Sequence, residues 1–173
     1  MKHQLRRGDL LWLLAYPIYQ LIGSLRHEAS HAAAAILQGA AIEELVFWPT
    51  RTGAGFRWGY VTWSGDVSWF ATGAPYLCDL ATFVIFLVIC TRVQFRRHWV
   101  WVNVVAIGLI SPLVNSAYNY VNGIRGVGDV TRLLGTLPDQ VVHAYFVITL
   151  LAYVGGIVFA LKPKVHSMTP EMP

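Results

Sequence analysis

Residues 27–31 read HEASH and match the pattern H-E-x-x-H. Two histidines four positions apart lie on the same face of an α-helix, so both imidazoles can reach one metal ion. Zinc suits two imidazoles and a third nitrogen or oxygen ligand, with a fourth position left for water. Glu28 is then placed to take a proton from that water during attack on a carbonyl. The motif therefore predicts a hydrolytic zinc site with His27 and His31 as ligands and Glu28 as the general base.

Structural histidines near a membrane interface are the alternative explanation of this motif. The run around it, SLRHEASHAAAAILQG, otherwise has the small and apolar residues of a buried helix. Ionisable side chains at membrane depth cost about 2.5 kcal/mol or more each, so three within two turns need a common purpose, which a metal provides. Arg26 indicates a position near the lipid headgroups, where polar residues are less costly. The alanines that follow predict close packing of neighbouring helices.

The third metal ligand has to come from another part of the chain. Asp129 in GVGDV is the best candidate, since the glycines before it let the backbone approach the site and a carboxylate completes the ligand set. The same aspartate could instead cap a short helix over VTRLLG, and the local sequence favours neither role. The other candidates are Glu43, Glu44, Asp66, Asp79 and His143.

The composition places these residues in a membrane protein. Of 173 residues, 55% are hydrophobic and 13% are charged, whereas soluble domains are about 25% charged. The net charge is +4, but the basic residues are scattered between apolar runs and form no basic face, so nucleic acid is not an expected partner. Cys78 and Cys90 lie in one apolar run at a spacing that argues against a disulfide.

Four apolar segments approach or exceed the roughly 20 residues that cross a bilayer. They are residues 10–38, 69–91, 98–121 and 139–161. The first is too long for one straight helix across the membrane, so it must tilt, kink near Pro17 or protrude. Residues 42–63 have β-favouring runs on both sides of PTRTGAG, which predicts a β-hairpin. We therefore expect an all-α membrane protein, a single domain over residues 1–173, with about four transmembrane helices and this hairpin.

Basic residues are distributed unevenly between the predicted loops. Eight lie in the N-terminus, the loop 92–97 and the C-terminal tail, namely Lys2, Arg6, Arg7, Arg92, Arg96, Arg97, Lys162 and Lys164. Four lie in the other two loops, namely Arg51, Arg57, Arg125 and Arg132. The positive-inside rule then predicts cytoplasmic N- and C-termini and a metal-binding motif toward the outer side.

With H-E-x-x-H in an early span and a Gly-Asp carboxylate after a later, asparagine-containing span, the chain resembles the site-2 protease family of intramembrane zinc metallopeptidases. In that family the two histidines and a later aspartate bind zinc, and the glutamate is the general base. The resemblance implies these roles for His27, His31, Asp129 and Glu28, with one catalytic zinc ion as cofactor. It also implies a membrane-protein or peptide substrate, cleaved in or near a transmembrane segment.

The chain departs from that family in its motifs and in its expected orientation. Valine follows Asp129 where the family often has glycine, and GAPYLCDL is only an approximate counterpart of the family's Gly-Pro-x-x-Asn element. Family members also typically hold the site nearer the cytoplasm. The alternative functions are a catalytically silent scaffold or chaperone and a metal transporter. The intact Glu28 argues against the first, and the presence of only one further histidine within a span, His143, argues against the second.

The hairpin and three asparagines are candidates for contacts with the substrate. A strand edge in residues 56–63 can pair with an unwound substrate segment, or the hairpin can be a structural lid. Asn115, Asn119 and Asn122 can bind substrate or support the metal ligands, or they can form hydrogen bonds between helices.

Overall fold

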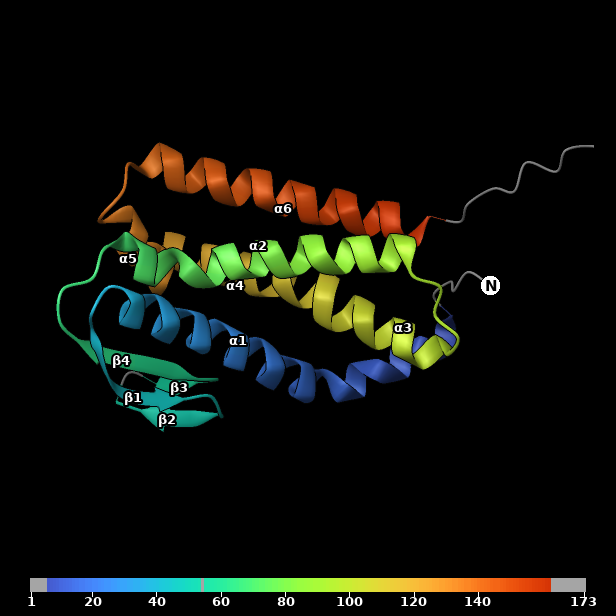
Figure 1. Ribbon diagram of the computed structural model, residues 1–173, viewed down its shortest axis with the longest axis horizontal. Helices are drawn as coiled ribbons and strands as arrows, with labels where there is room; N and C mark the ends of the chain where they lie inside the picture. Colours follow the sequence, from blue (N-terminus) through green and yellow to red (C-terminus); the bar gives the residue numbers. More distant parts are fainter. Residues whose placement is uncertain (1–5, 54, 163–173) are drawn as a thin grey trace, which may run out of the picture.

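The computed structural model describes residues 6–53 and 55–162, and most of these residues are helical. The helical elements are the 3₁₀ helix η1 (Arg7–Ala15), α1 (Tyr16–Leu37), α2 (Trp69–Arg92), α3 (His98–Val105), the π-helical turn η2 (Ala106–Ile110), α4 (Ser111–Ile124), α5 (Asp129–Leu134) and α6 (Asp139–Leu161). The strands are β1 (Ala41–Val46), β2 (Thr50–Thr52), β3 (Gly55–Arg57) and β4 (Tyr60–Ser64). The long helices run side by side, and the strands lie beside α1 at one end of the bundle (Figure 1).

Within the described part of the chain, three helical segments are long and apolar enough to cross a membrane, and they are Trp69–Arg92, His98–Ile124 and Asp139–Leu161. They correspond to the last three predicted spans, although the second of them extends further than predicted. The first predicted span, residues 10–38, is not among them. It is divided into η1 and α1 just before Pro17, and the polar residues of the H-E-x-x-H motif lower the mean hydropathy of α1. By length and hydropathy, the described residues therefore contain three candidate spans where four were predicted.

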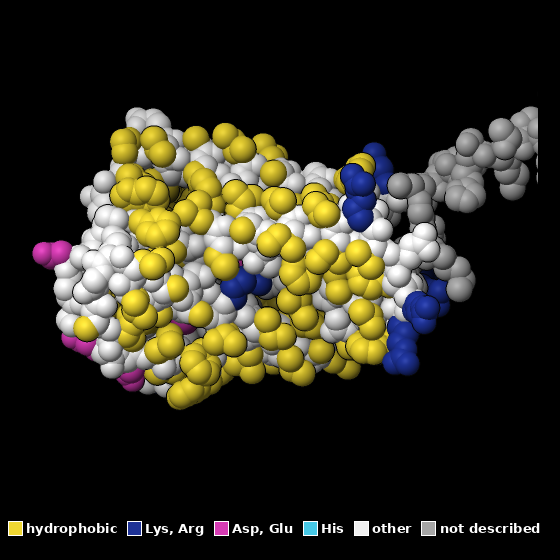
Figure 2. All heavy atoms as spheres, viewed as in Figure 1, with side chains coloured by type: hydrophobic (Ala, Val, Ile, Leu, Met, Phe, Trp, Pro, Cys, Tyr) yellow, Lys and Arg dark blue, Asp and Glu magenta, His cyan; other side chains and the backbone are white. Residues whose placement is uncertain are grey.

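The outer surface of the bundle is largely apolar. On α6, for example, Ile148, Leu151 and Phe159 are 66%, 68% and 64% exposed. Figure 2 shows hydrophobic side chains spread over the visible face, with Lys and Arg gathered mainly at one end and Asp and Glu at the other. An apolar surface between two charged ends suits a bilayer better than water.

Small residues let α1 and α2 pack closely against each other. A buried cluster contains Ala34 and Ala35 from α1 and Ala71 and Ala74 from α2. Side chains this short allow the helix backbones to approach, as in helix pairs within membranes. The packing role predicted for the alanines after the motif is therefore confirmed.

The strands form the predicted hairpin. β1 pairs antiparallel with β4, and β2 pairs antiparallel with β3 nearer the turn. β4 is paired along one edge by β1, and no third strand of the described residues pairs with its other edge. Gly59 lets the hairpin pack closely against α1. A Cβ at this position would lie 2.5 Å from Ser24 Oγ and 3.0 Å from Glu28 Cγ. The hairpin thus covers the turn of α1 that carries the predicted general base.

Candidate metal centre

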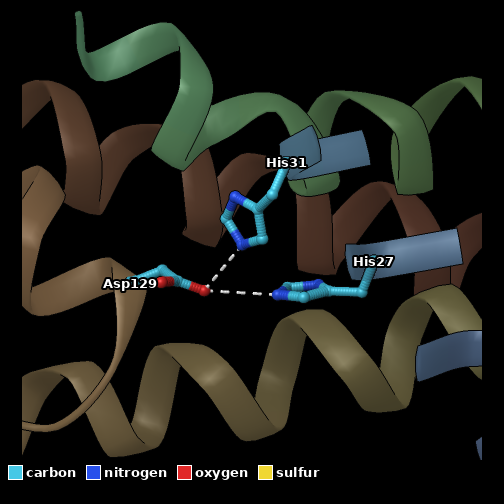
Figure 3. A group of neighbouring side chains, drawn as sticks. All are labelled: His27, His31 and Asp129. Atoms are coloured by element: carbon cyan, nitrogen blue, oxygen red, sulfur yellow. Dashed lines mark hydrogen bonds and ion pairs between the residues drawn. The ribbon is translucent and has the colours of Figure 1, made fainter. Parts of the chain in front are cut away.

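The three predicted metal ligands converge on one point. His27 and His31 lie one turn apart on the buried face of α1. Their rings meet edge to face, with the ring centroids 4.8 Å apart. Asp129, at the start of α5, points its carboxylate toward both rings (Figure 3). Its Oδ2 lies 3.2 Å from His27 Nε2 and 3.1 Å from His31 Nε2. The structure therefore brings together residues that are far apart in the sequence.

The three donors lie close enough together that they could hold one metal ion. One ligand atom from each residue can be chosen so that all lie within 4.8 Å of one another. Two ligands held about 2.0–2.1 Å from a tetrahedral ion lie about 3.4 Å apart, which is close to the separations of Asp129 Oδ2 from the two imidazole nitrogens. The set is the combination of two imidazoles and a carboxylate that zinc accepts, with a position left for water.

The hydrogen bonding of His31 supports a cation at this point. Its Nδ1–H donates to the carbonyl oxygen of Ala71 at 2.7 Å. In the neutral imidazole the lone pair is then on Nε2, which faces Asp129. A lone pair and a carboxylate oxygen 3.1 Å apart repel each other unless a proton or a metal ion lies between them. The backbone of α2 therefore fixes His31 in the tautomer that a metal ligand requires.

Asp129 has the charge state of a ligand. Burial raises the pKa of its carboxyl, but the hydrogen bonds and charges of His27 and His31 outweigh burial, and the pKa is held below its ordinary value. The residue in the cap position of α5 is Gly128, and the Asp129 carboxylate bonds to His27 and His31 instead. The alternative prediction, that Asp129 serves as the helix cap, is therefore wrong.

Glycines place Asp129 at the site. Gly126 and Gly128 have φ values of +83° and +87°, a region that residues with side chains rarely adopt. Gly123, at the end of α4, leaves room for α5, because a Cβ there would lie 2.3 Å from the Cβ of Val130. The residue after Asp129 is thus packed directly on the backbone of α4.

Glu28 is buried beside the two ligands, with 9% of its surface exposed. The hairpin covers this side of the centre, because a Cβ at Gly59 would lie 3.0 Å from Glu28 Cγ and the ring centroids of Trp63 and His31 are 6.0 Å apart. The predicted base is therefore enclosed between α1 and the hairpin, while α5 approaches the histidines with Asp129.

The other candidate ligands do not join the centre. Asp79 is paired with Arg26, and His143 Nδ1 is hydrogen-bonded to the hydroxyl of Tyr120 at 3.0 Å. The remaining candidates are exposed side chains in or beside the hairpin, namely Glu43, Glu44 and Asp66. Among the described residues, the group of three donors suited to a metal consists of the two motif histidines and Asp129.

A second polar cluster lies behind His27; its Arg26–Asp79 ion pair was not predicted from the sequence, whereas Asn115 was named as a residue that can support the metal ligands or bond between helices. Arg26 Nε donates to Asp79 Oδ1 at 2.8 Å, and Asn115 Nδ2 donates to Asp79 Oδ2 at 2.6 Å. The same amide nitrogen lies 3.2 Å from His27 Nδ1. The available signal was an arginine in one apolar segment and an aspartate in another, since charges at membrane depth are usually paired.

No protein-family model, no curated protein and no solved structure matches the chain significantly. Any assignment of function therefore depends on the residues and the geometry described above.

Proposed function

We propose that the protein is a zinc-dependent intramembrane endopeptidase, similar to the site-2 protease family, that cleaves a membrane-protein substrate in or near a transmembrane segment. The observation that carries this proposal is the convergence of His27, His31 and Asp129 next to Glu28. The setting supports it, because three neighbouring helices are long and apolar enough to cross a membrane. In this proposal α1, packed against α2, is the fourth helix in the bilayer.

The roles of the residues follow from their chemistry. A zinc ion bound here would supply the Lewis acid that polarises a peptide carbonyl and activates water. His27 and His31 would hold the ion as neutral donors, and Asp129 would hold it as an anion. Glu28 takes the proton from the attacking water and passes it to the amine that leaves.

The hairpin supports an extended binding mode for the substrate. A helical peptide engages its carbonyl groups in its own hydrogen bonds, so the segment to be cleaved has to unwind first. The edge of β4 that β1 leaves free can pair with such a segment by strand addition. Trp63 of β4 lies beside His31, so a peptide paired there would pass close to the metal centre.

The test compares zinc content and cleavage in Glu28→Gln and Asp129→Ala. We expect the first variant to retain one zinc per chain and to lose about 10²–10⁴-fold of its cleavage rate, since it lacks only the base. We expect Asp129→Ala to lose zinc and cleavage together. Zinc is measured by elemental analysis of the purified protein, and cleavage with unfolded casein and a set of single-span peptides in detergent.

Asp139→Asn is the matched control, because Asp139 is an exposed acid at the start of α6 that lies outside the metal centre. It should behave as the wild type in both measurements. A wild-type protein without zinc, or equal cleavage by Glu28→Gln, would contradict the proposal. Zinc flux across vesicles that depends on His27 without any cleavage would favour a transporter instead.

A further inference from the structure

A cavity of about 250 Å³ lies between the first helical elements, η1 and α1, and the second candidate span, which lines it from α3, η2 and α4. It is separate from the metal centre, since His27, His31 and Asp129 are not among its lining residues. We propose that this cavity binds one acyl chain of an anionic phospholipid whose phosphate lies at Arg6. The inference depends on the membrane setting of the protein and goes beyond the proposed zinc centre and its reaction.

The wall of the cavity suits a hydrocarbon chain. Val105, which is fully buried, lines it from α3. Two tyrosines of α1 also line it, and both hydroxyls have partners within the protein. The hydroxyl of Tyr19 donates to Asn103 Oδ1 at 3.0 Å. The hydroxyl of Tyr16 donates to Gln20 Oε1 at 3.1 Å. A chain can therefore cover this wall without leaving either hydroxyl unsatisfied.

The π-helical turn η2 shapes one side of the cavity. Its Gly108 packs directly on the ring of Phe86 in α2, while Ala106 and Ile110 line the cavity. Ala106 has only a methyl side chain, so it leaves space that a larger residue would fill. Turns of π-helix are rare and are frequently found at functional sites. The departure from α-helix in the second span thus coincides with the cavity.

The cavity opens onto the outer surface of the bundle. Leu10 and Ile110, which line it from η1 and η2, are 65% and 41% exposed. In a bilayer this apolar surface contacts lipid chains. A polymethylene chain is thin and flexible enough to enter a cavity of this volume, whereas a helix with its side chains is about 10–12 Å wide. A lipid chain therefore fits the cavity better than a partner helix does.

The charge beside the cavity specifies an anionic head group. Arg6 is a lining residue, and it has no ion-pair partner among the residues that the structure describes. Asp9 also lines the cavity, but its carboxylate lies 2.8 Å from His98 Nε2 and accepts the backbone N–H of Arg6 at 2.7 Å. The start of η1 lies at the end of the bundle where Lys and Arg gather (Figures 1 and 2). Basic pockets of this kind between membrane helices bind the head groups of anionic lipids.

The test measures lipid binding to the purified full-length protein by native mass spectrometry. The protein is titrated in detergent with phosphatidylglycerol or with phosphatidylcholine that carries the same chains. We expect one phosphatidylglycerol per protein chain, bound about fivefold or more tightly than phosphatidylcholine, which is the effect of one basic side chain near an anionic head group. Glycerol 3-phosphate, which has a phosphate but no acyl chain, should not compete.

Two variants remove the two parts of the site. Arg6→Gln should lower the affinity for phosphatidylglycerol about fivefold and leave that for phosphatidylcholine unchanged. Ala106→Phe should fill the cavity and lower the affinity for both lipids about tenfold, since about two methylene groups of the chain lose their burial. The matched control is Arg96→Gln, because Arg96 is an exposed basic residue between α2 and α3 that does not line the cavity. It should bind both lipids as the wild type does.

Equal affinity of the wild type for the two lipids, or an equal loss in Arg6→Gln and Arg96→Gln, would overturn the proposal. Unchanged lipid affinity in folded Ala106→Phe would overturn it too, because the chain would then lie elsewhere. The mass of a peptide or of a second protein chain in place of lipid would contradict it as well. If Ala106→Phe does not fold, the lipid preference of the wild type and the effect of Arg6→Gln decide the outcome. These measurements involve neither zinc nor cleavage, so failure of this inference is distinguishable from failure of the proposed function.

Discussion

At the scale of single residues, the two histidines and Asp129 differ in how far their positions in the site could be predicted from the sequence. His27 and His31 are placed by the period of one helix, so their convergence could be predicted from five residues of sequence. Asp129 could be chosen from its glycine neighbours, but its approach to the histidines depends on the packing of α5. The contact of Asn115 with His27 joins α4 to α1; Asn115 could be named as a candidate for such a contact, but its partner depends on helix packing.

Gly59 gives a prediction about how the base is enclosed. In Gly59→Ala the added methyl group would lie 2.8 Å from the Val46 carbonyl oxygen as well as against Ser24 and Glu28. Overpacking of this kind costs about 1–3 kcal/mol and shifts the backbone. We expect cleavage to fall because the hairpin moves away from Glu28, and zinc content to persist because no ligand comes from the hairpin.

Gly53→Ala is the control for this prediction, since Gly53 lies in the same hairpin and a Cβ there meets nothing within 4 Å. Thermal unfolding, zinc content and cleavage should all resemble the wild type in that variant. If Gly59→Ala cleaved at the wild-type rate, the close contact between the hairpin and α1 would have no bearing on catalysis.

At the scale of elements, the apolar runs predicted the long helices and the alternation of turn and strand residues predicted the hairpin. The division of residues 10–38 was harder to foresee, because the same apolar pattern suits a 3₁₀ and an α-helix, and only Pro17 marks the change. The π-helical turn η2 was also not predicted. It lies within an unbroken apolar run, where Gly108 passes so close to Phe86 that a Cβ would lie 2.1 Å from its ring.

The junction of α4 and α5 gives a prediction at this scale. Gly123→Ala would place a methyl group 2.3 Å from Val130 Cβ and 3.2 Å from its Cα, so α5 has to move. Asp129 is the adjacent residue, and a shift of α5 carries its carboxylate away from the histidines. We expect zinc affinity to fall about tenfold or more while the other helices remain folded, as measured by chelator competition and circular dichroism.

Gly135→Ala is the matched control at the other end of α5. There a Cβ meets only ordinary contacts, at 3.5 Å and 3.7 Å from backbone oxygens. Zinc affinity in this variant should equal that of the wild type. Equal affinity in Gly123→Ala would show that the position of Asp129 does not depend on the packing of α5 against α4.

At the scale of the whole molecule, most of the basic side chains of the visible face lie at the end of the bundle opposite the hairpin and α5. The start of η1 and the ends of α2 and α6 lie together at one end, whereas the hairpin and α5 lie at the other (Figure 1). The Lys and Arg side chains of the visible face gather mainly at the first end, and the Asp and Glu side chains at the second (Figure 2). Sequence order alone could predict this charge asymmetry, but the shared location of the hairpin, α5 and the motif required the packed structure.

This asymmetry predicts the orientation of the protein in the membrane. Because basic residues are retained on the cytoplasmic side, we expect the end with η1 to face the cytoplasm and the hairpin to face outward. The measurement uses single cysteines at two exposed positions, Gly53→Cys in the hairpin and Gln94→Cys between α2 and α3, in a parent in which Cys78 and Cys90 are alanine. A membrane-impermeant maleimide should label Gly53→Cys in intact cells, and Gln94→Cys only after permeabilisation.

The orientation also determines which compartment supplies the metal centre. If Gly53→Cys is labelled from outside, water and zinc reach Glu28 and the histidines from the outer side, because the hairpin and α5 lie at that end. The parent without cysteines should remain unlabelled in both conditions, which controls for reaction elsewhere. The reverse labelling pattern would contradict the charge-based orientation and place the metal centre near the cytoplasm, where the site-2 protease family typically holds it.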